Sequence, residues 1–219
     1  MKPKRRNGMY YIKVDGVERE FPSVTKIIND TLNKPALIRW AGITCTRIAL
    51  KNPELSEKEV MSEFGLGTRA SQTRGQGVHN IAERMPDIKE EDIPIDYINY
   101  YKALKSWWET HEPKRIGQEI ELYSVQYCVA GRCDFICTLG THEEKWLIDF
   151  KTGKALYNEV GVQLAIYKQM LSEMKICDIN KMGAVLLKDD GGFVFREYTD
   201  TLEDFLNVYK VWQWIQRRD

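Results

Sequence analysis

The spacing of apolar residues changes along the chain. In the first half they recur every three or four positions, as on one face of a helix, while from Ile120 onward apolar and polar residues mostly alternate, as in strands. The pattern predicts a largely helical N-terminal part, followed by a sheet with further helices. We therefore expect an α/β (α+β) protein.

The N-terminal part begins with a predicted β-hairpin over residues 10–21. Two aromatic or alternating runs flank Asp15-Gly16, a dipeptide that tolerates a tight turn, and we expect the hairpin to lie on an edge. Ser23, after Pro22, is placed to cap a helix. The helices expected next cover residues 24–32, 36–50, 57–64, a stretch from after Gly65 and Gly67 to about residue 85, and 95–111.

Ser56 and Glu59 form a predicted capping box for the third of these helices. Beyond Pro113 the period becomes that of strands. Strands are expected over residues 120–127, 131–139 and 145–150, separated by Gly131 and by a polar turn at 140–144, and then over 182–188 and 192–198. Helices are expected over residues 157–174 and 201–218.

Composition limits the classes of function. The 32 basic residues balance 32 acidic ones, so the net charge does not indicate nucleic-acid binding. Only short basic runs could form a local patch, although such runs are usually solvated surface: Lys2, Lys4, Arg5, Arg6, Arg69, Arg74, Arg217 and Arg218. No apolar stretch reaches the ~20 residues of a membrane helix, and the basic start lacks the apolar core of a secretory signal. We expect a cytosolic protein without a membrane partner.

The five cysteines, at positions 45, 128, 133, 137 and 177, have no paired zinc-knuckle spacing. We expect buried thiols in a reducing compartment rather than disulfides or a structural zinc site.

The segment LIDFKTGK, residues 147–154, ends an apolar run with two opposite charges. Residues two apart in a strand face the same way, so Asp149 and Lys151 should share a face while Phe150 points to the other. A carboxylate is a good ligand for Mg²⁺, and an ammonium group nearby can orient a water against a phosphate. The alternative is a salt bridge at a strand end.

Neighbouring strands offer further carboxylates. Asp134 closes GRCD in the preceding strand, where antiparallel pairing would bring it close to Asp149, and one strand earlier Glu119 and Glu121 share a face. Converging carboxylates repel unless a cation lies between them, which predicts a divalent metal. Periodicity does not decide which glutamate points inward, and both could belong to an exposed edge.

The ordered set of Glu119, Asp134, Asp149-Phe150-Lys151, Gln163 and Tyr167 resembles the PD-(D/E)xK nuclease superfamily. More narrowly it is similar to the RecB-type exonucleases, including phage relatives and the mitochondrial genome maintenance exonucleases. The upstream RGQGVH, ending at His79, and the segments FPSVTKII and KPALIRWA resemble the helical part of that group. The resemblance covers about Phe21 to Tyr167. Leu-Ile replaces the proline before Asp149, and only Cys177 lies where relatives with an iron–sulfur cluster carry three cysteines.

The resemblance implies a restriction-endonuclease-like core, with a central mixed β-sheet flanked by helices, plus the N-terminal hairpin and a helical wall. The chain would be one nuclease domain over residues 1–219, its hairpin and helical part in 1–112 and its core in 113–219.

The resemblance also implies roles for site residues. Asp134 and Asp149 would hold the metal together with the Phe150 carbonyl, and Lys151 would position the attacking water. Glu119 fits the third carboxylate better than Glu121. His79 would approach the metal as a neutral imidazole, although a pairing with Glu83 on its own helix is the ordinary alternative. Nucleic-acid contacts are expected from Arg74, Thr152, Lys154, Gln163 and Tyr167, of which Gln163 and Tyr167 could instead brace a packed helix.

The expected function is that of a metal-dependent DNA exonuclease acting on DNA ends or single strands, in recombination, repair or replication. It would use one or two Mg²⁺ or Mn²⁺ ions, without an iron–sulfur cluster, and would work in the cytoplasm, or the host cytoplasm if viral. The alternatives are a structure-specific endonuclease on the same core and a catalytically silent nucleic-acid-binding domain.

Overall fold

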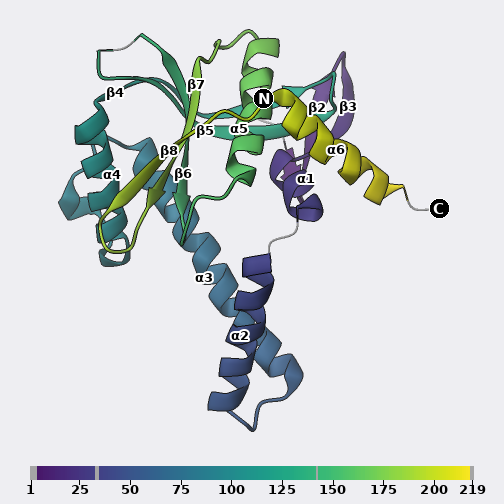
Figure 1. Cartoon of the computed structure of the whole chain (residues 1–219), viewed down its shortest axis with the longest axis vertical. Coiled ribbons are helices and arrows are strands. Elements are labelled where there is room, and N and C mark those ends of the chain that lie inside the picture. The colour runs from purple at the N-terminus through teal and green to yellow at the C-terminus, as the bar shows by residue number, and fades with distance from the viewer. Residues whose placement is uncertain (1–3, 33–34, 142, 218–219) are drawn as a thin grey trace.

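A five-stranded mixed sheet, a three-stranded antiparallel sheet and six α-helices make up the fold of the computed structural model, which describes residues 4–32, 35–141 and 143–217 (Figure 1). The central sheet has the order β4-β5-β6-β7-β8, with bounds β4 (Pro113–Ser124), β5 (Val129–Leu139), β6 (Lys145–Thr152), β7 (Lys181–Leu187) and β8 (Phe193–Tyr198). The helices are α1 (Val24–Thr31), α2 (Pro35–Lys51), α3 (Glu57–Glu83), α4 (Ile98–His111), α5 (Glu159–Glu173) and α6 (Leu202–Gln216), with short 3-10 turns η1 (Glu90–Asp92) and η2 (Ile95–Tyr97).

Neighbouring strands of the central sheet are antiparallel except β6 and β7, which are parallel. A parallel pair needs a crossover connection, and α5 supplies it. The strand that carries Asp149 is therefore paired on both sides in the middle of the sheet.

Helices cover both faces of this sheet because alternate strand residues point in opposite directions. On one face, Leu147 packs with the apolar residues of α1, α5 and α6. On the other, Ile148 and Phe150 pack with the ends of α3 and α4, where Leu104 and Trp107 are fully buried. Buried apolar side chains cover both faces of the sheet, which confirms the predicted core sheet.

The predicted hairpin is confirmed as β2 (Met9–Val14) and β3 (Val17–Pro22), with Asp15 and Gly16 at positive φ in the turn. An unpredicted strand, β1 (Lys4–Arg6), pairs with β2 and makes it the middle strand, so only β3 keeps the expected edge position. The small sheet packs over the start of β5.

The two predicted N-caps are confirmed, while the helices expected from residues 95 and 157 begin at Ile98 and Glu159. Ser23 Oγ accepts a hydrogen bond from the Lys26 amide at 3.1 Å, and Ser56 and Glu59 make the reciprocal bonds of a capping box. The expected interruption at Gly65 and Gly67 is wrong, because α3 runs through both as one helix of 27 residues. Glycine weakens a helix by about 1 kcal/mol but, unlike proline, keeps its amide donor.

The predicted strand boundaries need two corrections. Strand β4 begins at Pro113 rather than near residue 120, and Gly131 lies inside β5, since the turn falls at residues 125–128. Gly131 allows a close approach of helix α5: a Cβ there would lie 2.4 Å from the Tyr167 ring. The predicted turn at 140–144 and the predicted last helix fall partly outside the described residues, as do Lys2 and Arg218 of the basic runs.

The cysteine prediction holds only in part. Cys133 and Cys137 are buried, Cys45 and Cys177 are half-buried, and Cys128 is exposed in the turn before β5. Within the described residues no helix is both long and apolar enough to cross a bilayer.

Helix α2 and about the first three quarters of α3 form an antiparallel pair that projects from the rest of the molecule (Figure 1). We call residues 35–76 the arm. Trp40 and Phe64 pack between its two helices with ring centroids 5.3 Å apart. No described side chain of α2 is buried. The apolar contacts of the arm are therefore mostly between its own two helices, with few to the rest of the molecule.

Candidate metal centre

Three carboxylates lie in one row across three adjacent strands. The pairs on either side place Glu119 of β4 opposite Asp134 of β5, and continuing the β5–β6 register one residue past Phe135 and Ile148 places Asp134 opposite Asp149 of β6. The flanking register pairs are Gln118 with Phe135, Ile120 with Cys133, and Phe135 with Ile148. Residues directly opposite each other in a sheet point to the same side, so sheet pairing gathers these three acids.

Glu119 has an unusual backbone. Its φ is +48°, in the left-handed region that non-glycine residues seldom adopt. Such a conformation costs of order 1–3 kcal/mol and is concentrated at functional sites. It interrupts the alternation of β4, because Gln118 faces a cavity beside α3 while Ile120 packs toward α5.

His79 reaches this row from helix α3. Its Nδ1 lies 3.6 Å from Glu119 Oε1 and 3.5 Å from Asp134 Oδ2. Ligand atoms of His79, Glu119 and Asp134 all lie within 4.8 Å of one another, the spacing of groups that share an ion. Among the described residues Glu121 is not part of such a group. The geometry therefore favours Glu119 over Glu121 as the third carboxylate.

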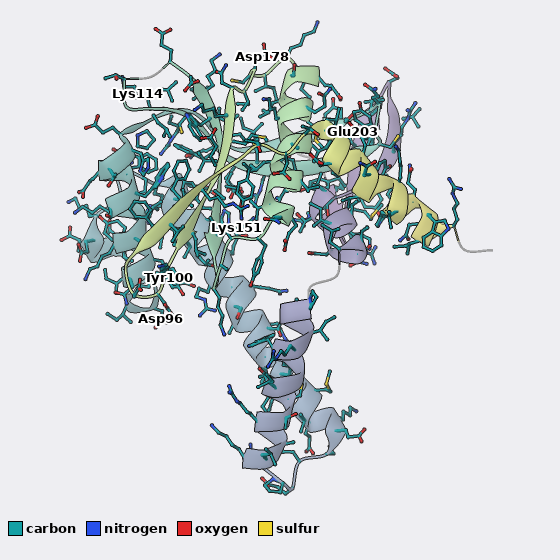
Figure 2. The ribbon with its side chains drawn as sticks, viewed as in Figure 1. Asp96, Tyr100, Lys114, Lys151, Asp178 and Glu203 are labelled. Carbon is teal, nitrogen blue, oxygen red and sulfur yellow. The ribbon has the colours of Figure 1, made fainter. Side chains whose placement is uncertain are left out.

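Asp149 and Lys151 form the ion pair that the sequence left open as an alternative. Lys151 Nζ lies 2.6 Å from Asp149 Oδ2, and the Asp149 side chain is only 4% exposed. Asp149 stands beside the His79 group, not within it. Figure 2 shows Lys151 near the end of β6.

The backbone of β6 also holds Asp134. The Phe150 amide donates to Asp134 Oδ2 at 2.9 Å. The Phe150 ring points to the opposite face, as predicted, and packs edge-on against Trp107 with ring centroids 5.5 Å apart. Asp134 is thereby oriented by the strand that carries Asp149 and Lys151.

The electrostatics reflect crowding of negative charge. Burial, and next the charge of Asp149, raise the pKa of Asp134 to about 7. Burial lowers the pKa of His79, but its bond to Glu119 and the charges of Asp134 and Asp149 outweigh this and raise it. Burial likewise lowers the pKa of Lys151, and the two aspartates outweigh it. The cluster thus favours the positively charged forms of His79 and Lys151.

Arg132 is a site residue that the sequence reasoning missed. Its Nε lies 2.7 Å from Glu119 Oε2, and its side chain is 41% exposed. The sequence did offer one sign of this role, because Arg132 lies two residues before Asp134 in the segment GRCD. Neither Glu119 Oε2 nor Asp149 Oδ2 accepts an aligned hydrogen bond from the described residues, although each adjoins a cationic group. Each of these oxygens is therefore neutralised by a neighbouring cationic side chain.

The remaining predicted residues surround the row. Gln163 Nε2 donates to Tyr167 OH at 3.1 Å on α5, and Tyr167 is buried. We therefore interpret this pair as bracing the site rather than contacting a ligand. Thr152 ends β6, Lys154 is exposed in the loop after it, and Arg74 is exposed on α3.

No protein-family model and no curated protein matches the chain. Among solved structures it is similar to a crystal structure of SSO0001, at 16% sequence identity and a TM-score of 0.35, over 79% of this chain and 71% of that chain.

Proposed function

We propose that the protein is a divalent-metal-dependent deoxyribonuclease with a restriction-endonuclease-like core, similar to the RecB-type branch of the PD-(D/E)xK superfamily, and that it acts as an exonuclease on DNA ends or single strands. The observation that carries the proposal is the row of Glu119, Asp134 and Asp149, with Lys151 beside it and His79 across it.

The donor set fits Mg²⁺ or Mn²⁺. Carboxylate oxygens are the ligands these ions prefer, and an imidazole nitrogen suits Mn²⁺. Glu119, Asp134 and Asp149, with the Phe150 carbonyl and His79, would hold one or two ions. The raised pKa of Asp134, caused by burial and next by the charge of Asp149, supports this fit, since a cation among these acids would relieve their repulsion.

A bound ion would polarise the phosphodiester and lower the pKa of a water. The protein's own part is positional. Lys151, held by Asp149, would orient the attacking water and stabilise negative charge on the phosphate, since a preorganised cation costs no rearrangement during the reaction. The Phe150 amide fixes Asp134, and the packed Phe150 ring fixes the amide. The site is thus anchored on the rigid face of the sheet.

Access to the site supports a strand end as substrate. His79 and Gly75 bring α3 against the end of β6, where a Cβ at Gly75 would lie 3.7 Å from Thr152 Oγ1. Helix α3 therefore forms a wall on one side of the row. A wall there favours a single strand or a frayed end over an unbent duplex.

The proposal is tested by incubating the full chain with end-labelled and circular DNA, each single- and double-stranded, in EDTA, Mg²⁺ or Mn²⁺. We expect mononucleotides or short oligonucleotides from linear DNA with metal, and no product in EDTA. Cleavage of circles would support the endonuclease alternative instead. Retention of DNA in gel shifts, without shortening under any condition, would support the silent binding domain and overturn the proposal.

A further inference from the structure

The arm differs from the rest of the chain in charge. The whole chain has equal numbers of acidic and basic residues, yet helix α2 has no acidic residue and neither has α3 between residues 64 and 82. These two stretches carry five basic residues: Arg39, Arg47, Lys51, Arg69 and Arg74. The acidic residues of the arm lie at its far tip, between residues 54 and 63, where α2 ends and α3 begins. Apart from this acidic tip, the two helices of the arm therefore carry only positive charge along their length, which favours binding of a polyanion there.

The same surface exposes apolar side chains. Leu50 is 75% exposed and Ile43 is 42% exposed. With Arg39 and Arg47 they recur at spacings of four, four and three residues, so they lie along one face of α2. Leu37, Ile38 and Leu66 extend the exposed apolar area of the arm. Guanidinium and aliphatic groups thus alternate along a helix that the body leaves uncovered.

We infer that the arm is a binding surface for single-stranded nucleic acid, which it leads to the carboxylate row. The inference rests on the proposed nuclease function for the destination of the strand. Phosphates would pair with the arginines, while exposed base faces would pack on the aliphatic side chains and guanidinium planes. A duplex hides its base faces and gains only the first of these contacts. An acidic protein segment would use the charges but has fewer planar apolar groups to offer.

The geometry connects this surface to the site. Helix α3 is continuous from the arm to His79, and an α-helix rises 1.5 Å per residue. Arg74 therefore lies roughly 8 Å along the axis from His79, and Arg69 roughly 15 Å. A nucleic-acid strand whose reacting end lies at the carboxylate row would therefore need further nucleotides to reach these arginines on the arm. Affinity should rise with oligonucleotide length even where the reacting end is identical.

The test measures binding without catalysis. A fluorescent single-stranded oligonucleotide is titrated with the full chain in EDTA at several salt concentrations, using the triple variant Arg39→Gln, Arg47→Gln, Arg69→Gln. We expect affinity to fall by at least about tenfold, and the slope of log affinity against log salt to fall by about 2, at roughly 0.7 per lost phosphate contact. A matched control replaces three exposed basic residues of the body, Arg19, Lys105 and Lys210, with Gln. Equal loss in the control, or no loss in the arm variant, overturns the inference.

A second variant separates bases from phosphates. Ile43→Ser with Leu50→Ser changes exposed positions, so the fold should persist by circular dichroism. We expect weaker binding of single strands with an unchanged salt slope, and little change for duplex. Equal weakening for duplex, or competition by polyglutamate as effective as by oligonucleotide, would overturn the assignment to single strands.

These outcomes are independent of the nuclease test. Loss of binding in the arm variant of a chain that never cleaves would support the arm and reject the nuclease. Cleavage by a chain whose arm variant binds normally would support the nuclease and reject the arm.

Discussion

The central sheet and the arm stabilise their helices in different ways. In α4, which packs on the sheet, Ala103, Leu104 and Trp107 are completely buried, whereas α2 in the arm has no buried side chain among those described, and Leu50 is mostly exposed. Burial of a large apolar side chain contributes about 1.5–3 kcal/mol to the free energy of folding. The helices on the sheet gain this stabilisation, and α2 does not. The comparison suggests a division of work, with chemistry in the rigid body and capture on the extended arm.

The largest expected effect lies in the body. If the proposed function holds, Asp149→Asn and Lys151→Ala should each lower cleavage by at least about 10³-fold, because each removes a charge that the proposed mechanism places at the reacting groups. The measurement is the initial rate of release from labelled single-stranded DNA with Mn²⁺. Asp189→Asn, in an exposed loop, should leave the rate unchanged. Comparable activity in either site variant would reject the assigned centre.

Thiol reactivity compares the two regions directly. Burial raises the pKa of Cys137 to about 12, so at pH 8 its reactive thiolate should be about 10³-fold scarcer than in an ordinary thiol. Cys45 on the arm is half-buried. Pulsed alkylation at pH 8 with peptide mass spectrometry should label Cys45 early and Cys137 only after unfolding. Early labelling of Cys137 would mean that the body opens as readily as the arm.

Within the row, the two glutamates of β4 should differ. Glu119→Gln should lower cleavage by about 10²-fold and weaken Mn²⁺ binding in calorimetry, because this side chain belongs to the cluster. Glu121→Gln should change either quantity by less than about threefold, a shift of under about 1 kcal/mol. The reverse order would move the third carboxylate to Glu121.

A glycine in the body should resist substitution. In Gly131→Ala the new Cβ would meet the ring of Tyr167, so α5 or β5 must shift. We expect a loss of about 1–3 kcal/mol in the free energy of unfolding, measured by urea denaturation. A neutral result would show that α5 can move away from the sheet without cost.

The smallest effect is expected on the arm, and in the opposite direction. A Cβ at Gly67 meets nothing within 4 Å, so Gly67→Ala should gain up to about 1 kcal/mol from helix propensity alone. Far-ultraviolet circular dichroism should show more helix on heating. Destabilisation here would indicate that the arm packs against something in solution.

Most elements could be predicted from the sequence because their signals are local. The Asp15-Gly16 turn, the caps at Ser23 and Ser56 and the alternation around Leu147 depend only on neighbouring residues, and the structure confirms each. The continuous α3 could not be predicted, because a glycine inside a helix costs little when no proline follows. Strand β1 has only three residues, too few for a period to show.

The acidic residues of the site and Lys151 could be predicted from the sequence, but Arg132 and its pairing with Glu119 could not. Asp134, Asp149 and Lys151 carry a strand-spaced signal, and the structure brings them together, while their chemical roles stay predictions. The pairing of Arg132 with Glu119 depends on the left-handed backbone at Glu119, which no pattern of residue types encodes. The arm projects because the rest of the molecule does not pack against it. The spacing of apolar residues shows that a helix has an apolar face, but not whether another element covers that face.

The three acids of β4, β5 and β6 lie side by side only in one hydrogen-bond register of these strands. Shifting β5 or β6 by one residue would turn its acid to the opposite face, where Phe135, Ile148 and Phe150 pack with α3 and α4, and a charge would then be buried there. Single-residue insertions should therefore be tolerated in the turns at 125–128 and 188–192, where no pairing is displaced, and not inside the strands. A scan of insertions along the chain would trace the row without any knowledge of substrate.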